Sequence, residues 1–367
     1  MIMYIDVMIQ RLRYTFGING IALKWFESYL TNRSVKVCVN KTYSKEKMLS
    51  CSAPQGSKLG PRMYSDYTKP LGNLASLLAL CYHFYADDTQ LYKVVNPRSI
   101  EDQFCSKKVL EDSIACISEW MYHNKLKLNQ EKTEFIIFSS NVNCKHIAVD
   151  NILLGTATIP RASTVRNLGV YMDMQLNMMY HVNDVKKRCF YYMRWIWGVR
   201  HLLTTQATKY VVHALVISRL DYCNSVLYGL PKCAIHELQL VLNAAARLVT
   251  RCSRDTRIKP ILMNLHWLPV EYRIQFKTLC LAFKGLHNQA PEYITDMLSP
   301  YEPSRRLRSS EQRLLTVPRT NLKYGTRAFS VAAPSLWNSL PPDIRATDSY
   351  ECFKKMLKTH LFRVAFL

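Results

Sequence analysis

The amino-terminal half of the sequence alternates between helix-like and strand-like patterns of apolar residues. Leu23, Phe26 and Leu30 recur at three- and four-residue spacing, which predicts a helix over residues 21–30. Residues 35–39 alternate between apolar and polar side chains and predict a half-buried strand, which we expect to pair with a second strand at residues 48–51. Helical spacing returns over residues 104–121 and predicts an amphipathic helix, from Phe104 to Met121, that packs on a sheet.

Two adjacent aspartates lie between two runs of strand-forming residues. Residues 82–85 precede Asp87 and Asp88, and residues 91–95 follow them, which predicts a hairpin with both carboxylates at a rigid strand end. Hard divalent cations prefer carboxylate oxygens, and a two-metal site for phosphoryl transfer needs several of them close together. A solvated turn is the alternative, because Asp is a favoured turn residue.

Three further segments read as strands. Residues 135–138 are strand-like, and residues 153–159 and 165–170 together predict a hairpin with Gly155 and Gly169 at its bends. From about residue 181 the pattern is largely helical, with one segment at 211–220, a second at 235–249 after Pro231, and a closing helix at 349–361. The sequence therefore predicts an α+β fold whose second half is mostly helical.

The charge balance changes what these elements are expected to bind. The 367 residues hold 49 Lys and Arg against 27 Asp and Glu, a formal net charge of +22. Residues 181–367 hold 28 basic and 12 acidic residues, so +16 of the +22 lies there. Such a surplus indicates a polyanionic partner, with nucleic acid first and an anionic membrane surface second. We expect most phosphate contacts in the second half.

The cysteine pattern and the hydropathy indicate in which cellular compartment the protein is expected. The twelve cysteines form no Cys-x-x-Cys pair, which argues against a zinc ribbon and a redox dithiol, and a reducing compartment follows. The first thirteen residues are interrupted by polar groups and do not form a secretory signal. No apolar run approaches the roughly 20 residues that span a bilayer. The protein is expected in the cytoplasm and/or nucleus, not secreted and with no membrane partner.

Four segments, in this order, resemble the conserved blocks of a reverse transcriptase palm of the LINE-type (non-LTR) retrotransposon kind. They are Ala-Pro-Gln-Gly-Ser-Lys-Leu-Gly-Pro at 53–61, His-Phe-Tyr-Ala-Asp-Asp-Thr-Gln-Leu-Tyr at 83–92, the segment 126–134 with the strand-like run after it, and Asn-Leu-Gly-Val at 167–170. The segments 265–270, 304–310, 317–320 and 332–341 are similar to the C-terminal tail of one broad group of LINE polyproteins.

The resemblance implies a three-part architecture. Residues 1–180 would form a partial fingers and palm region, an antiparallel sheet with helices that includes the Tyr-Ala-Asp-Asp hairpin. Residues 181–258 would form a helical thumb-like region, for which a plain helical bundle with a solvated basic face is the alternative. Residues 259–367 would form the basic C-terminal domain of LINE polyproteins.

The resemblance also implies RNA-directed DNA polymerization by in-line attack of a hydroxyl on the α-phosphate of a dNTP. Asp87 would hold catalytic Mg²⁺, with Mn²⁺ as the alternative ion, and Asp88 would support it. Lys132 would protonate the departing pyrophosphate, and an exposed structural lysine is the alternative.

The partners implied are an RNA template, a DNA primer and dNTPs. Residues that would border the templating base and the incoming nucleotide are Pro54, Gln55, Gly56, Tyr85 and Ala86. For the block at 54–56, an ordinary turn before a helix is the alternative, because Pro fixes φ and Gly permits tight backbone paths.

Two groups of residues would contact the nucleic-acid backbone. Leu168 and Gly169 fall in the region that carries the primer grip in the family. Arg305, Arg306 and Arg308 lie in a basic segment interleaved with aromatic residues, a composition that can bind a backbone and stack bases. A docking surface is an equal alternative for these arginines.

Some positions depart from the family pattern. Lys58 and Arg62 stand where apolar residues are usual. The first palm strand of the family, with its third metal-binding carboxylate, lies upstream of residue 11, and Asp6 is too close to the following helix to replace it. We therefore expect an incomplete metal site and impaired activity. Two other hypotheses stay open: an inactive nucleic-acid-binding remnant, and a translated relic with no selected role.

Overall fold

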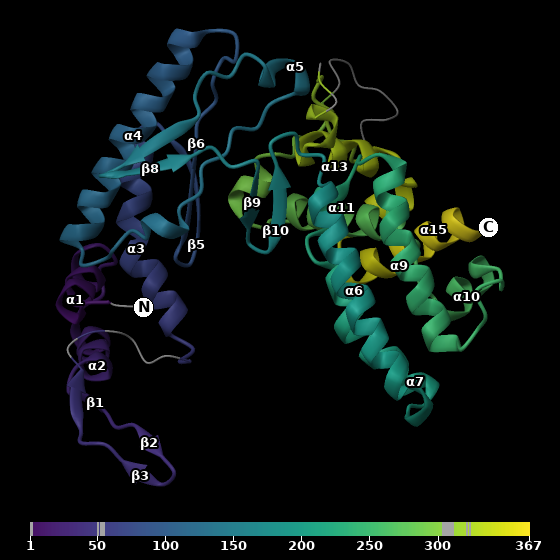
Figure 1. Ribbon diagram of the computed structural model, residues 1–367, viewed down its shortest axis with the longest axis horizontal. Coiled ribbons are helices and arrows are strands. Elements are labelled where there is room, and N and C mark those ends of the chain that lie inside the picture. Colours follow the sequence, from purple (N-terminus) through teal and green to yellow (C-terminus); the bar gives the residue numbers. More distant parts are fainter. Residues whose placement is uncertain (1–2, 50, 52–55, 303–311, 321, 323) are drawn as a thin grey trace. The chain divides into compact units, whose positions relative to one another are not determined.

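The computed structural model describes residues 3–49, 51, 56–302, 312–320, 322 and 324–367. The chain divides into two compact units, Met1–Ser163 and Thr164–Leu367, called unit 1 and unit 2 below (Figure 1). Helices and small antiparallel sheets occur together, so the predicted α+β class is confirmed. The palm, thumb and tail boundaries remain predictions.

Unit 1 combines helices with two-stranded antiparallel sheets. Its helical segments are α1 (Ile5–Tyr14), α2 (Gly20–Leu30), α3 (Gly60–Leu77), α4 (Ile100–His123), the 3-10 turn η1 (Gln130–Lys132) and α5 (Asn141–Cys144). Its strand pairs are β1 (Arg33–Val35) with β4 (Lys47–Leu49), β2 (Cys38–Val39) with β3 (Thr42–Tyr43), β5 (Cys81–Tyr85) with β6 (Asp88–Tyr92), and β7 (Asn151–Leu154) with β8 (Ala157–Pro160).

Two apolar clusters hold unit 1 together. The first joins α1, α2 and α3, where Met8, Leu30 and Tyr67 are fully or almost fully buried. The second joins α4 to the β7–β8 hairpin through Ile114 and Ile152, with Leu91 of β6 packed against it. Isolated two-stranded hairpins are marginally stable in water, so packing on α3 and α4 is what holds these strands.

The predicted strand elements of unit 1 are partly confirmed. The helix at 21–30 is α2, and residues near 35 and 48 pair as β1 and β4. The expected half-buried strand at 35–39 is wrong, because β1 ends at Val35, β2 begins at Cys38, and residues 35–39 are all exposed. The expected strand at 135–138 is wrong: Phe135 makes a single parallel bridge to Arg161, and no ladder continues from it in the described segment. The expected hairpin over 153–170 is also wrong. Gly155 and Gly169 each close a hairpin of their own, β7–β8 and β9–β10.

The predicted helix at 104–121 is α4, and Ile114 and Ile117 of the expected apolar stripe are buried, but the first turn departs from it. Phe104 is half exposed, whereas Gln103 is buried. The Gln103 side-chain amide donates to the carbonyl oxygens of Pro97 and His146, both at 2.8 Å, and its Oε1 accepts from the Ala148 N–H at 2.8 Å. Because this amide satisfies three backbone groups, a polar residue takes the buried position that periodicity alone assigns to an apolar one.

Unit 2 is mostly helical. It begins with the hairpin β9 (Thr164–Asn167) and β10 (Val170–Asp173). Its helical segments are α6 (Met179–Val199), η2 (Arg200–Leu202), α7 (Thr205–Val212), the π-helical η3 (His213–Ile217), α8 (Ser218–Asp221), η4 (Asn224–Leu227), α9 (Lys232–Thr250), α10 (Ile258–Leu265), α11 (Val270–Leu286), α12 (Glu292–Thr295), η6 (Gly325–Arg327), α13 (Phe329–Asn338), α14 (Pro342–Arg345) and α15 (Tyr350–Phe366). The helices predicted near 211–220, 235–249 and 349–361 are confirmed.

The core of unit 2 has two parts. In the first, α6 and α9 pack along each other and bury Val182, Leu238 and Leu242 (Figure 1). In the second, α11, α13 and α15 meet around the Phe353 ring, whose centroid lies 4.5 Å from that of Phe283 and 5.7 Å from that of Trp337. Stacked aromatic rings add specific geometry to a large buried apolar area.

Two general expectations can be compared with the described residues. None of the helices that the structure describes is both long and apolar enough to cross a membrane. All twelve cysteines lie in the described part of the chain, and none of them forms a disulfide there.

Candidate functional site

The two aspartates lie where the sequence predicts them, at the tip of a hairpin. Tyr85 of β5 pairs with Asp88 of β6, so Ala86 and Asp87 form a two-residue turn. Ala86 has φ of +54°, a left-handed conformation that such tight turns require. Both carboxylates are exposed.

Pleating decides which side of this hairpin faces the protein. Tyr82 and Phe84 are half-buried, and the Tyr82 ring lies over Gly72 of α3, where an added Cβ would come within 3.1 Å of the Tyr82 hydroxyl. Successive residues of a strand point to opposite faces, so the cross-strand pair Tyr85 and Asp88 lies on the other face of the hairpin, where both residues are exposed. The absence of a side chain at Gly72 therefore lets the hairpin dock on α3 with its tip free.

Tyr64 of α3 is a neighbour of the hairpin that sequence reasoning missed. Burial raises the pKa of the Tyr64 phenol, and the negative charge of Asp87 raises it further. The phenol is thus close enough to sense the carboxylate and stays protonated at neutral pH. Its position on the helix that directly follows the Pro-Gln-Gly block was a usable signal.

The carboxylates fit a divalent ion only in part. Carboxylate oxygens suit Mg²⁺, which commonly uses one or two of them and completes its shell with water and substrate phosphates. Asp87 and Asp88 provide that number. In the described ranges no three His, Cys, Asp or Glu side chains gather into a metal-holding group. The hairpin tip therefore supplies the number of carboxylates that one such ion commonly uses, and the described residues do not assemble a larger ligand group for two ions.

Of the other predicted site residues in unit 1, the structure describes Gly56 and Lys132. Gly56 lies in an exposed turn with φ of +82°, and the Ser57 hydroxyl accepts from the Gly60 N–H at 3.0 Å where α3 begins. Pro54 and Gln55 lie outside the described residues. Lys132 ends the 3-10 turn η1 with an exposed side chain, and its backbone N–H donates to Asn129 Oδ1 at 3.3 Å.

The predicted primer-grip residues form the turn of the β9–β10 hairpin in unit 2. Leu168 and Gly169 have φ of +45° and +84°, and left-handed angles at both positions are typical of a type I′ turn. The Tyr222 hydroxyl donates to the Leu168 carbonyl at 2.7 Å, and its ring lies against Gly169. Tyr222 therefore fixes the shape of this turn, and nothing in the sequence pattern connects the two segments.

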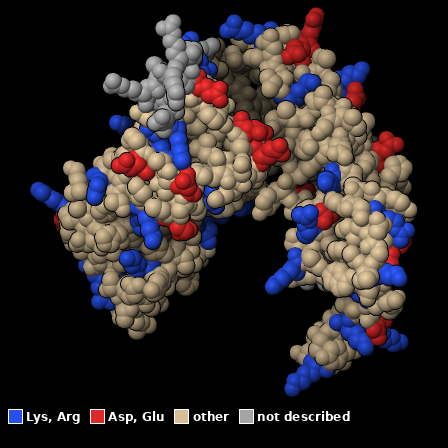
Figure 2. All heavy atoms as spheres, turned by 180° about the vertical axis from the view of Figure 1, so that it is seen from behind, with Lys and Arg blue, Asp and Glu red and all other residues tan. Residues whose placement is uncertain are grey.

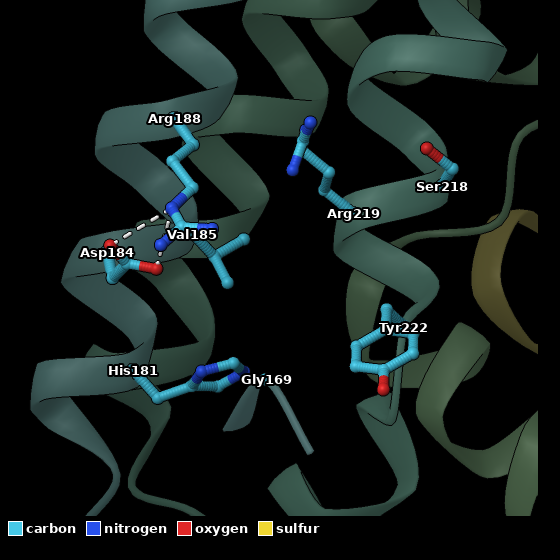
Figure 3. Close-up of a pocket in the computed structure, with 8 residues that line it drawn as sticks. All are labelled: Gly169, His181, Asp184, Val185, Arg188, Ser218, Arg219 and Tyr222. Atoms are coloured by element: carbon cyan, nitrogen blue, oxygen red, sulfur yellow. Dashed lines mark hydrogen bonds and ion pairs between the residues drawn. The ribbon is translucent and has the colours of Figure 1, made fainter. Parts of the chain in front are cut away.

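A cavity of about 340 Å³ opens beside this turn (Figure 3). On its α6 side, Arg188 forms an ion pair with Asp184 at 3.0 Å. His181 Nδ1 accepts from the Tyr171 N–H at 3.4 Å. Burial lowers the pKa of His181, the Asp184 charge opposes this and the Arg188 charge adds to it. The imidazole is therefore neutral at pH 7, with its proton on Nε2.

Arg219 of α8 supplies the remaining positive charge of the cavity. Its Nη2 donates to the Tyr192 hydroxyl at 3.1 Å, and its guanidinium lies 4.6 Å from the Tyr192 ring centroid. Its Nε is buried and has no hydrogen-bond partner among the residues that the structure describes. A cation with an unused donor beside a cavity suits an anionic ligand.

The remaining predicted site residues, Arg305, Arg306 and Arg308, lie outside the described residues. Figure 2 shows that Lys and Arg side chains are spread over the face of the molecule seen from behind.

The class of protein follows from a comparison with known families. Residues 9–172 match the family described as reverse transcriptase (RNA-dependent DNA polymerase), and this stretch includes the hairpin with Asp87 and Asp88 and the turn at Leu168 and Gly169. This part of the chain is therefore similar in sequence to the reverse transcriptase family.

Curated relatives narrow the class. The chain is 24% identical over 296 residues to the probable RNA-directed DNA polymerase from transposon BS of Drosophila melanogaster, covering 77% of this chain and 31% of the relative. It is 24% identical over 233 residues to the probable RNA-directed DNA polymerase from transposon X-element of Drosophila melanogaster, covering 62% of this chain and 24% of the relative. It is 22% identical over 213 residues to the enzyme from mobile element jockey of Drosophila funebris, covering 56% and 22%.

These relatives confirm the prediction of a LINE-type, non-LTR reverse transcriptase origin. The chain spans less than a third of the length of each of these three relatives.

Proposed function

We propose that this chain performs nucleotidyl transfer as a non-LTR reverse transcriptase, extending a DNA primer on an RNA template. The observation that carries the proposal is the exposed pair Asp87 and Asp88 at the tip of a hairpin docked on α3, within the residues that match the family. A rigid hairpin tip holds two carboxylates in the open, where a metal-bound nucleotide can approach them.

In this proposal Asp87 and Asp88 hold a divalent ion, Mg²⁺ or Mn²⁺. When bound, the ion would neutralise negative charge on the substrate phosphates. The Tyr64 phenol stays protonated at neutral pH and interacts electrostatically with Asp87. Lys132, exposed and outside any ion pair in the described part of the chain, donates a proton toward the leaving pyrophosphate.

The incoming nucleotide is proposed to lie between the hairpin and the Pro-Gln-Gly block. Pro54, Gln55 and Gly56 border the templating base and the incoming nucleotide, with Tyr85 and Ala86 on the hairpin side. The exposed turn at Gly56 has no side chain and permits close approach of a ligand to the backbone.

The primer is proposed to lie against the turn at Leu168 and Gly169. Tyr222 holds that turn rigid, and the positive charge of Arg219 lines the cavity beside it. In the wider arrangement, residues 1–180 form fingers and palm, residues 181–258 a thumb, and residues 259–367 a basic domain whose Arg305, Arg306 and Arg308 contact the nucleic-acid backbone.

The test is primer extension by the full chain on a primed RNA template with Mg²⁺. Asp87→Asn should reduce extension to the level seen without a divalent ion, because one of two metal-holding carboxylates is lost. Asp112→Asn is the matched control, since Asp112 is exposed on α4 and the charge change is the same. Equal extension by the wild type and Asp87→Asn would contradict the proposed role of Asp87.

A second candidate is nucleic-acid binding without polymerization. It is favoured by the net charge of +22 and by the lack of a third metal-holding side chain near the hairpin in the described ranges. It predicts affinity for RNA that falls steeply with salt in the wild type and in Asp87→Asn alike, with no extension by either protein. Extension by the wild type would exclude it.

A further inference from the structure

A second cavity in unit 2 lies between α11 and α15 and is lined mainly by lysines. Its volume is about 400 Å³, and its lining residues are Phe276, Lys277, Cys280, Tyr350, Lys354, Lys355 and Lys358. None of these residues was singled out as a functional residue from the sequence, and all lie outside the residues that match the reverse transcriptase family.

Tyr350 brings positive charges together at this cavity. The ammonium nitrogens of Lys284 and Lys354 each lie 4.8 Å from the centroid of its ring. The two charges are therefore closer to each other than about one Debye length, ~10 Å at 0.1 M salt, so they repel despite screening. The electron-rich ring face offsets part of this repulsion.

The same positive charges affect the pKa of the buried Cys280 thiol. Burial raises the pKa of Cys280, while a hydrogen bond with Tyr350 and the positive charges of Lys277, Lys354 and Lys284 lower it. Lysines of both α11 and α15 therefore lie close enough to the Cys280 thiol to influence its pKa. The cluster is an arrangement of the fold and not a run of adjacent residues in the sequence.

These lysines have little counter-charge. In the described part of the chain, Glu351 is the one carboxylate in an ion pair with any of them; it lies 2.8 Å from Lys354 and is 71% exposed. The positive charge of the five lysines Lys277, Lys284, Lys354, Lys355 and Lys358 is therefore compensated only in part. A bound polyanion would relieve their mutual repulsion and release its own counterions.

We propose that the cavity between α11 and α15 binds phosphate groups of a nucleic-acid backbone, at a site separate from the hairpin that carries Asp87. The cavity offers flexible ammonium groups and no planar guanidinium fork, so it recognises charge and not base sequence. The choice of nucleic acid as the polyanion rests on the similarity to the reverse transcriptase family and on the +16 charge of residues 181–367.

The test is a salt titration of binding between the full chain and a mixed-sequence single-stranded RNA. The double variant Lys277→Gln, Lys358→Gln should make the plot of log affinity against log salt shallower by about 0.7 for each phosphate that is no longer neutralised. The double variant Lys232→Gln, Lys259→Gln removes the same charge from exposed positions of unit 2 and should keep the wild-type slope. Equal slopes for the two variants would overturn the proposal.

Two further variants and ligands identify the source of the phosphate. Lys277→Arg with Lys358→Arg keeps the charge and should restore the wild-type slope. Inorganic tripolyphosphate and phosphatidylserine vesicles are tested on the same proteins. If either binds through these lysines while RNA binding is the same in the wild type and in Lys277→Gln, Lys358→Gln, the partner is not nucleic acid and the proposal fails.

Footprinting of the unaltered chain tests the site without substitutions. RNA should protect the five lysines from an amine-reactive reagent more strongly than it protects Lys232 and Lys259, and equal protection would overturn the proposal. The same result is expected with Asp87→Asn protein. Loss of primer extension and loss of this protection are therefore separate outcomes, one for the polymerase proposal and one for this site.

Discussion

The two units differ in how their apolar residues are used. Among the described residues, the buried clusters of unit 1 contain eight and four residues, whereas those of unit 2 contain 27 and 14. Each described sheet of unit 1 has two strands, and the β5–β6 and β7–β8 hairpins depend on α3 and α4 for burial. The residues that carry the family resemblance are thus concentrated in the unit with the smaller cores.

This difference separates chemistry from stability. Asp87 and Asp88 are exposed at a hairpin tip, where a substitution disturbs little packing. In unit 2, side chains such as Phe283 and Trp337 are surrounded on all sides and determine whether the unit folds. Substitutions should accordingly affect function more than stability at the hairpin, and stability most strongly in the core of unit 2.

The largest effect is expected for Phe283→Ala. Phe283 is fully buried, and its ring lies 3.9 Å from that of His287 and 4.5 Å from that of Phe353. Truncation should cost about 3–5 kcal/mol of unfolding free energy, measured by hydrogen exchange of α11 amides. Leu154→Ala in the smaller core of unit 1 should cost about 2 kcal/mol, the low end for a buried leucine, because the β7–β8 hairpin can relax around it.

Exposed Leu202 provides the control for both substitutions. Leu202→Ala should change the unfolding free energy by no more than about 0.5 kcal/mol. A loss at Leu154 as large as that at Phe283 would remove the distinction between the two cores.

The sequence predicted the elements whose pattern is local. α2, α4, α9 and α15 follow from helical spacing, and the β5–β6 hairpin follows from β-formers around a turn. The failures came from pairings that local pattern does not encode. Residues 135–138 look like a strand, but Phe135 finds a single partner, Arg161, and a strand needs a ladder to persist.

The site residues follow the same rule: those in a contiguous motif were predicted, and those brought together by packing were not. The sequence located Asp87 and Asp88 because the motif is contiguous. It could not find Tyr222 or Arg219, since their relation to the turn at Leu168 arises only when α8 packs beside β9–β10. It also missed the lysine cavity, whose members come from two helices about seventy residues apart.

Buried arginines were likewise missed, because charged residues are rarely buried without partners. Arg200 is 5% exposed, and its guanidinium donates to the carbonyl oxygens of Leu248, Val249 and Leu203 at 3.0, 2.8 and 2.8 Å. Two of these carbonyls belong to the last turn of α9, so Arg200 satisfies groups that a helix end leaves open.

The second prediction concerns the Arg200 cap on α9. Arg200→Met should cost about 1.5–3 kcal/mol, because hydrogen bonds from a charged donor are lost and the carbonyls stay buried. The readout is hydrogen exchange over the last turns of α9. Arg194→Met, at an exposed position of α6, should leave that exchange unchanged. Unchanged exchange in Arg200→Met would mean that water replaces the guanidinium, and the cap would then be unimportant for unit 2.

The smallest effect is expected from pH. Burial lowers the pKa of His181, as it does that of His213, both in unit 2. The unfolded chain therefore binds protons at these positions more readily than the folded chain does. The free energy of unfolding should hold steady above the ordinary histidine pKa of 6.5 and decrease as the pH falls below it. Urea unfolding of unit 2 between pH 7.5 and 5.5 measures this dependence.

A matched pair of variants tests whether His181 causes this pH dependence of the unfolding free energy. His181→Gln should make the decrease shallower, because glutamine can accept from the Tyr171 N–H without titrating. His201→Gln, at an exposed position of η2, should retain the wild-type decrease. If His181→Gln and the wild type lose stability in parallel, burial of this imidazole does not couple unit 2 to pH. The cavity beside Leu168 and Gly169 would then be more accessible to water than its lining indicates.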